Sequence, residues 1–316
     1  MVLDTRRIGD LDVSIVGVGC NNFGRRLDKA GTEAVVHTAL EAGINFFDTA
    51  DVYGDGASEE YLSKALGSRR DEAVIATKFG AKIAGDPSRS GASPHWIERA
   101  VEDSLRRLDT DHIDLYQLHR PDEDTPIEDT LEALDRLVSV GKVCQIGCSN
   151  YSEIKIEEAL ATSHERGLAR FVSVQNEYSL LHREPEHGVT KACLRNGLAL
   201  LPYFPLASGM LTGKYSRGKE APAGSRLAGM SASRAERFAN ERNFDHVEQL
   251  ETFAKERGHT ILELAISWLV AQPVVASVIA GATSPEQVWA NVEAARWQLL
   301  DRDLTEIDRI TRDLPA

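Results

Sequence analysis

The chain has 316 residues, of which 42% are hydrophobic, and 36 basic residues against 49 acidic residues give it a net charge of −13. This acidic balance disfavours a non-specific role on nucleic acid or on an anionic membrane surface, and no apolar stretch approaches the ~18 residues that a membrane span needs. Only four cysteines are present, too few for the dense disulfide framework of many secreted proteins, so we expect a cytoplasmic protein.

Short apolar runs of strand length alternate along the chain with longer amphipathic stretches. The predicted strands are Val13–Gly19, Ile44–Asp48, Ala73–Lys78, Ile113–His119, Val143–Ser149, Phe171–Gln175, Leu198–Tyr203 and Ser277–Gly281. The predicted helices are Thr32–Ala42, Glu59–Leu66, Ser93–Leu108, Ile127–Val140, Tyr151–Ala161, Pro185–Asn196, a pair within Asp245–Ala271, and Pro285–Ala295. Nearly all-apolar strands are typical of a parallel sheet that is buried on both faces. Eight such alternations predict an α/β fold, a (β/α)8 TIM-type barrel that occupies residues 1–316 as one domain.

Two segments depart from this alternation. Asp4–Val13 contains Gly9-Asp10 between two β-prone runs, which predicts a hairpin that caps the bottom of the barrel. Ser216–Asn243 follows the seventh strand and is rich in Gly, Ser, Arg and Ala, so we expect a long functional loop at the active rim. A dinucleotide-binding Rossmann fold is disfavoured, because Gly17-Val18-Gly19 has no third glycine at the required offset.

Four titratable residues stand at or just after the ends of consecutive predicted strands. Asp48, Lys78 and His119 end the second, third and fourth strands, and Tyr53 follows the second. Each alone has an ordinary structural explanation, but neighbouring strands lie ~4.8 Å apart, so all four can converge at one rim. A phenol has a pKa near ~10, and a nearby ammonium favours the phenolate and lowers that value. The set therefore predicts a phenolic acid, activated by a lysine that a carboxylate holds, which protonates a carbonyl oxygen.

Long motifs around these residues resemble those of the aldo-keto reductases, in particular their longer-chain bacterial branch. The similar segments are NFFDTADVYG at 45–54 with Ser58-Glu59, ATK at 76–78, DLYQLH at 114–119, GK at 141–142, IGCSNY at 146–151, YFPLASGMLTGKY at 203–215, and GATSPEQ at 281–287 with Asn291. They cover nearly the whole chain in the expected order.

The resemblance implies roles for the four residues. Tyr53 would be the general acid, Lys78 held by Asp48 would lower the pKa of Tyr53, and His119 would orient the carbonyl. Cys20, Asn21, Asn22 and Phe23, which follow the first strand, are expected to border the substrate pocket, with Asn21 and Phe23 contacting substrate together with Tyr53 and His119.

The resemblance also implies a nicotinamide cofactor. Ser149, Asn150 and Gln175 would hold the carboxamide, and Tyr203 would stack on the nicotinamide ring. Further contacts are implied for Phe204, Pro205, Leu206, Ser208, Gly209 and Lys214 at the pyrophosphate, and for Gly281, Thr283, Gln287 and Asn291 at the adenosine end. Arg226 in the long loop is the candidate for the 2′-phosphate, because a guanidinium suits a phosphate. We therefore expect NADP, with NAD as the alternative.

A metal site is not expected. Cys144 and Cys148 are four residues apart on one predicted strand and share a face, but no histidine lies at ligand spacing in the sequence, so two buried thiols are the favoured interpretation.

The predicted function is the reversible reduction of a small aldehyde or ketone with NADPH. Two alternatives stay open: a nicotinamide-binding, redox-sensing regulatory subunit, and a lyase that forms a Schiff base through Lys78.

Overall fold

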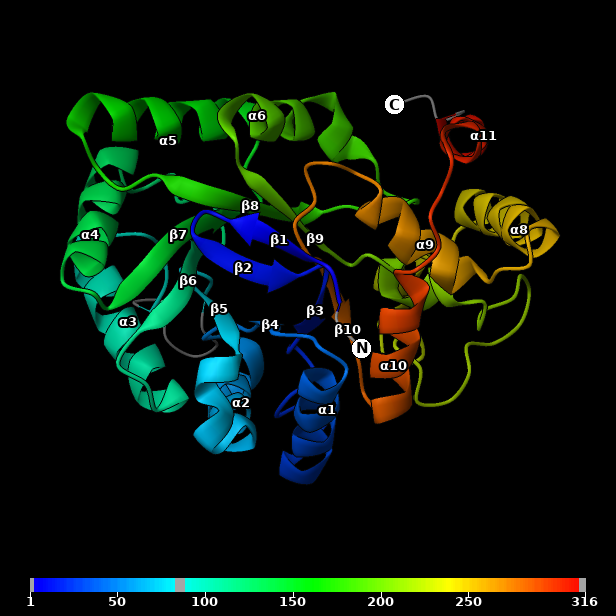
Figure 1. The fold of residues 1–316 in the computed structure, drawn as a ribbon, viewed down its shortest axis with the longest axis horizontal. Helices are drawn as coiled ribbons and strands as arrows, with labels where there is room; N and C mark the ends of the chain where they lie inside the picture. Colours follow the sequence, from blue (N-terminus) through cyan, green and yellow to red (C-terminus); the bar gives the residue numbers. More distant parts are fainter. Residues whose placement is uncertain (1–2, 83–88, 313–316) are drawn as a thin grey trace.

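Eight parallel strands form the centre of the molecule, as the computed structural model of residues 3–82 and 89–312 shows (Figure 1). They are β3 (Val16–Gly19), β4 (Phe46–Asp48), β5 (Val74–Phe79), β6 (Ile113–Leu118), β7 (Val143–Ser149), β8 (Phe171–Glu177), β9 (Ala199–Tyr203) and β10 (Val278–Gly281). The strands pair in chain order, and β10 pairs with β3. A single parallel bridge between Leu200 and Val275 joins the remaining edges. The predicted (β/α)8 barrel is confirmed.

Helices surround the strands (Figure 1). They are α1 (Lys29–Glu41), α2 (Ala57–Leu66), α3 (Pro94–Leu108), α4 (Ile127–Ser139), α5 (Glu153–Arg166), α6 (Val189–Asn196), α8 (Glu241–Glu256), α9 (Ile261–Val270), α10 (Pro285–Ala294) and α11 (Asp301–Arg312). Their ends follow local chemistry. Ser93 caps α3 ahead of Pro94 at its first turn, and Thr260 and Glu263 form a capping box on α9. Within the described residues, no helix combines the length and the apolar character that crossing a bilayer requires.

The predicted hairpin closes one end of the barrel. Strands β1 (Thr5–Ile8) and β2 (Leu11–Ser14) pair antiparallel and lie in front of the barrel strands in Figure 1. Ile8 and Val13 are fully buried and pack with Phe46, Ala76 and Leu115, which point into the barrel. The barrel interior is therefore a packed core, and the hairpin closes this end of it.

The structure differs from the prediction at three places. The predicted strand Val13–Gly19 breaks after Ser14, whose side chain bonds the carbonyl of Val16 and whose backbone bonds Asn45. The long loop contains a short helix, α7 (Ala232–Glu236), and the first residues of α8. Helix α11, which lies beyond the last predicted helix, was not predicted.

Candidate active site

A buried ion pair lies at the carboxyl ends of β4 and β5. The Lys78 ammonium donates to Asp48 Oδ2 at 2.7 Å and to the carbonyl of Thr49 at 2.8 Å, and the Lys78 side chain is fully buried. Burial pulls the pKa of Lys78 down, but Asp48 and then Tyr53 outweigh it, so the net direction is upward. Lys78 is therefore a fixed cation, which disfavours the Schiff-base alternative because an imine forms only from the neutral amine.

Tyr53 lies directly above this ion pair. It begins the short 3-10 segment η1 (Tyr53–Gly56) after β4, and the Lys78 nitrogen is 5.2 Å from the centroid of its ring. Burial raises the pKa of the Tyr53 phenol, and Lys78 opposes that rise by its charge and by a hydrogen bond. The net shift of the Tyr53 pKa is upward, in contrast to the lowering that we predicted. The loss of hydration on burial raises the pKa by more than Lys78 lowers it. The phenol therefore keeps its proton at neutral pH.

His119 faces Tyr53 as a neutral imidazole. It follows β6, and its ring meets the Tyr53 ring edge to face at 5.9 Å. Burial, the Lys78 cation and Arg120 lower the pKa of His119 to about 3. Its Nδ1 atom is buried and has no hydrogen-bond partner among the described residues. A neutral ring with a free polar atom can bind a carbonyl or hydroxyl group without competing for the catalytic proton.

A second buried acid lies behind the loop that carries Tyr53. Both Asp51 oxygens are buried and lack a hydrogen-bond partner among the described residues. Glu59 nearby is held by Thr77 at 2.6 Å and by Arg107 at 2.6 Å. Burial, then the charge of Glu59, raises the pKa of Asp51 to about 7. The sequence did not indicate the raised pKa of Asp51, because its position after Ala50 is that of an ordinary turn residue.

Replacing Asp51 by Asn should stabilise the protein, and the gain should grow with pH. The unfolded chain ionises Asp51 near its ordinary pKa of 3.8, whereas the folded chain holds the proton until about pH 7. Between these values the folded state binds more protons, so its stability falls as pH rises, and an uncharged amide at this position would remove that loss. We expect the Asp51→Asn advantage to increase by about 2–4 kcal/mol from pH 4 to pH 7 and then level off. Urea unfolding across this range measures it; a pH-independent difference would contradict the buried, protonated Asp51.

An elongated cavity of about 850 Å³ opens above the four residues. Most of the predicted site residues line it, namely Asn21, Asp48, Tyr53, His119, Ser149, Asn150, Gln175, Tyr203, Phe204, Pro205, Leu206, Ser208, Gly209, Lys214, Arg226, Gly281, Thr283, Gln287 and Asn291. Lys78 lies beneath the cavity floor. Asn22 lines the cavity, but Cys20 and Phe23 are not brought to it, because their side chains are fully buried in the core.

Polar side chains on β7, β8 and β9 form one wall. Tyr203 donates to Asn150 Oδ1 at 2.7 Å, and Asn150 in turn donates to the Ser149 hydroxyl and to the carbonyl of His119, both at 3.0 Å. The Gln175 amide donates to Asp48 Oδ1 at 2.8 Å. This chain of bonds fixes the orientation of the Tyr203 ring relative to Tyr53, His119 and the ion pair.

The loop after β9 provides backbone groups at the middle of the cavity. Phe204, Ala207 and Ser208 adopt positive φ angles of 52°, 44° and 57°, followed by Gly209 at 98°. Non-glycine residues in this conformation are strained, and such residues cluster at binding sites. The Ser208 hydroxyl is buried without a partner among the described residues, and Lys214 lies close to Gly209. Successive backbone N–H groups in a tight turn can form a concave anion-binding loop, so this loop suits a phosphate.

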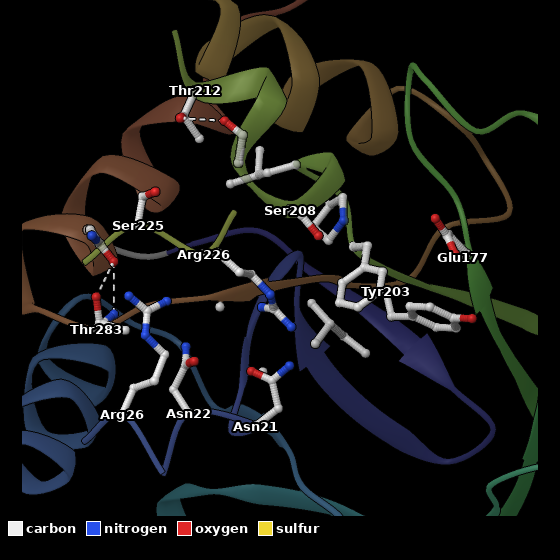
Figure 2. Close-up of a pocket in the computed structure, with 18 of the residues that line it drawn as sticks. Asn21, Asn22, Arg26, Glu177, Tyr203, Ser208, Thr212, Ser225, Arg226 and Thr283 are labelled. Atoms are coloured by element: carbon white, nitrogen blue, oxygen red, sulfur yellow. Dashed lines mark hydrogen bonds between the residues drawn. The ribbon is translucent and has the colours of Figure 1, made fainter. Parts of the chain in front are cut away.

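Several arginines line the cavity. Figure 2 shows Arg26 and Thr283 at one side of the cavity, Tyr203 and Glu177 at the other, and Arg226 between them. Arg226 stacks over Phe204 at 4.9 Å, and Arg26 bonds the carbonyl of Gly224 in the same loop. Burial, then the charges of Arg26 and Arg234, lowers the pKa of Arg226. The sequence analysis did not assign Arg26 and Arg234 to the site, because neither stands in a motif that distinguishes it from a solvent-exposed cation.

The match to known proteins is extensive. The model of the Aldo/keto reductase family matches residues 15–312. The chain belongs to the aldo/keto reductase family. The chain is 37% identical to a probable voltage-gated potassium channel subunit beta of Oryza sativa over 86% of this chain and 84% of that one. It is 31% identical to an L-glyceraldehyde 3-phosphate reductase of Escherichia coli over 93% of this chain and 87% of that one.

A solved relative has the same fold. The structure of the aldo-keto reductase AKR11C1 from Bacillus halodurans, in its holo form, superimposes with a TM-score of 0.82 at 32% identity, covering 98% of this reductase and 96% of that chain. The predicted family and its bacterial relatives are thus confirmed. The oxidoreductase chemistry of the family accounts for a rim that combines a phenol, a fixed ammonium and a neutral imidazole.

Proposed function

We propose that this aldo/keto reductase reduces an aldehyde or ketone to the alcohol, reversibly, with Tyr53 as general acid and base. The observation that supports this most directly is the buried Lys78–Asp48 pair beneath Tyr53, with neutral His119 beside it at the cavity floor. A reduced nicotinamide bound in the cavity would supply the hydride.

The protein's own contribution is a single proton and its electrostatic surroundings. His119 binds the carbonyl oxygen and directs it to Tyr53. As negative charge grows on that oxygen, the Tyr53 hydroxyl transfers its proton, and the nearby Lys78 cation stabilises the phenolate that is left. Asp48 keeps Lys78 in place and charged. Because the pKa of free Tyr53 is raised, the proton stays on the phenol until a strongly basic alkoxide develops.

The cavity residues fit a nicotinamide dinucleotide. Ser149, Asn150 and Tyr203 would hold and cover the nicotinamide end, and the positive-φ loop at Ser208 and Gly209 would take the pyrophosphate with Lys214. The buried, unpartnered Ser208 hydroxyl is the observation that supports this fit.

We favour NADP over NAD because of the arginine cluster in the cavity. Burial lowers the pKa of Arg226 most, and the positive charges of Arg26 and Arg234 lower it further; a bound 2′-phosphate would offset the repulsion between these charges. Glu177, which also lines the cavity, is paired with Arg237.

Removing Arg226 should therefore weaken the binding of NADPH more than that of NADH. We expect Arg226→Ala to raise the KM for NADPH about 10-fold or more, because a charged hydrogen bond to phosphate is lost, and to leave the KM for NADH nearly unchanged. Steady-state kinetics with each cofactor measure this. Lys219→Ala is the matched control, since Lys219 is an exposed cation of the same loop that does not line the cavity. Equal effects on both cofactors would contradict a 2′-phosphate contact.

The proposed reaction is tested by incubating the purified protein with a panel of aldehydes and ketones and following substrate-dependent loss of absorbance by NADPH and by NADH. A regulatory role is the second candidate, because the rice relative is named as a channel subunit. Tight nicotinamide binding with negligible turnover on the whole panel would favour that role instead.

A further inference from the structure

A cluster of three metal-ligating side chains lies at the end of the barrel opposite the active site. A ring nitrogen of His112, an Asp114 oxygen and Cys144 Sγ lie within 4.8 Å of one another. His112 immediately precedes β6, Asp114 is the second residue of β6, and Cys144 is the second residue of β7. No hint of this was visible in the sequence, because His112 and Cys144 are separated by more than thirty positions.

Strand register brings the three groups together. Ile113 pairs with Val143 and Leu115 with Gln145, so Asp114 and Cys144 lie side by side on neighbouring strands. Leu115 points into the barrel, so Asp114 and its alternate neighbour His112 point outward on the same face. The expectation of two buried thiols holds for Cys148 but is wrong for Cys144, which is the only exposed cysteine of the four, so its sulfur is open to an incoming ion.

His112 and Asp114 each have one ligand atom held by a neighbour and one that is available to an ion. His112 Nδ1 bonds the carboxylate of Asp111 at 2.7 Å, which turns Nε2 toward Asp114 Oδ1 at 3.7 Å. Asp114 Oδ2 accepts from Arg70 at 2.7 Å and from the backbone of Ile75 at 2.9 Å, which leaves Oδ1 available. A carboxylate behind a ligating histidine and a bonded carboxylate ligand are the outer contacts that orient metal ligands in proteins.

Charge and ligand type select the ion. With the thiolate formed, Asp111, Asp114 and Cys144 carry three negative charges against the single positive charge of Arg70, so a divalent cation would bring the cluster to neutrality. Thiolate, imidazole and carboxylate are zinc ligands, whereas Mg²⁺ and Ca²⁺ prefer oxygen alone. Bonds of about 2.0–2.3 Å in a tetrahedron separate the ligand atoms by about 3.3–3.8 Å. The cluster needs to contract by only about 1 Å to reach this, and the half-exposed His112 side chain has room to move.

We propose that His112, Asp114 and Cys144 form a Zn²⁺ site, with water as the fourth ligand, at the amino-terminal ends of β6 and β7. Zinc there replaces the thiol proton of Cys144, joins β6 to β7 and is remote from the reacting carbonyl. The site is therefore a structural one, in keeping with the stabilising role of this end of a barrel.

The test uses the full chain, stripped with a chelator and desalted, and titrated with Zn²⁺ in a calorimeter. We expect one equivalent to bind, and Zn²⁺ to protect the Cys144 thiol from a thiol-reactive dye. Co²⁺ should give a sulfur-to-metal charge-transfer band. Cys144→Ser should abolish that band, and His112→Gln should abolish one-equivalent binding.

Two further variants sharpen the result. Asp111→Asn should weaken Zn²⁺ binding by about 10-fold or more, because it removes only the contact behind His112. His164→Gln removes an exposed histidine from α5 and should change nothing. The proposal is overturned if the parent binds no stoichiometric Zn²⁺, or if Cys144→Ser and His112→Gln bind it as the parent does. Carbonyl reduction is measured separately, and its presence or absence does not affect this outcome.

Discussion

Replacing Tyr53 by Phe should reduce kcat by roughly 10²- to 10⁴-fold, the range typical of losing a general acid, while the affinity for NADPH stays nearly unchanged. The change removes one oxygen and keeps the ring that packs against His119 and Lys78. Steady-state turnover and a fluorescence titration of NADPH measure the two quantities on the same preparation.

The control for this variant is Tyr61→Phe. Tyr61 lies on α2, where Lys29 covers its ring at 5.7 Å, and it does not line the cavity. Its loss of a hydroxyl should leave kcat within about twofold of the parent, since it donates no proton to substrate. If Tyr53→Phe lost turnover and NADPH affinity to the same extent, Tyr53 would be a cofactor ligand and the general acid would have to be sought elsewhere.

Replacing Lys78 by Met should have the largest effect on stability. The Asp48 carboxylate would stay buried without its partner, and breaking a buried ion pair on one side costs about 3–5 kcal/mol. The Lys78 side chain is 0% exposed and that of Asp48 only 4% exposed, so water cannot compensate. Urea unfolding measures the loss, and carbonyl reduction should disappear as well.

The double variant Lys78→Met/Asp48→Asn separates the two effects. Without the buried charge, much of the stability should return, because replacing both members of a buried pair is often close to neutral. The amides of Gln175 and Gln117, which donate to Asp48 Oδ1 at 2.8 Å and 3.3 Å, can still donate to the amide oxygen that the substitution places there. Activity should stay absent. Recovery of activity in the double variant would show that the phenol does not need the lysine.

The fold was predictable because its signals are local. Strand β7 was predicted with the observed boundaries, Val143–Ser149, since its apolar residues are bounded by Gly141-Lys142 and Asn150. Ser93-Pro94 marked the start of α3 in the same way. The convergence of Asp48, Lys78 and His119 also followed from the sequence, because the carboxyl ends of consecutive parallel strands always meet at one rim.

Other features depend on which way a side chain points and on how much water it loses. Phe23 stands next to two cavity residues, yet packing turns its ring into the core. The raised pKa of Tyr53 and of Asp51 arises from burial, which no motif reports. Arg26 joins Arg226 only because the long loop folds back over the cavity.

By itself, then, the sequence determined the barrel, the family and the four residues at the rim, since each rests on order and spacing along one chain. Only the three-dimensional structure revealed the protonation of those residues, the cluster of Arg26, Arg226 and Arg234 in the cavity, and the contact of His112 with Cys144. The physical reason is that hydration, charge repulsion and contact between strands act through space, between residues whose separation in sequence carries no information about their distance.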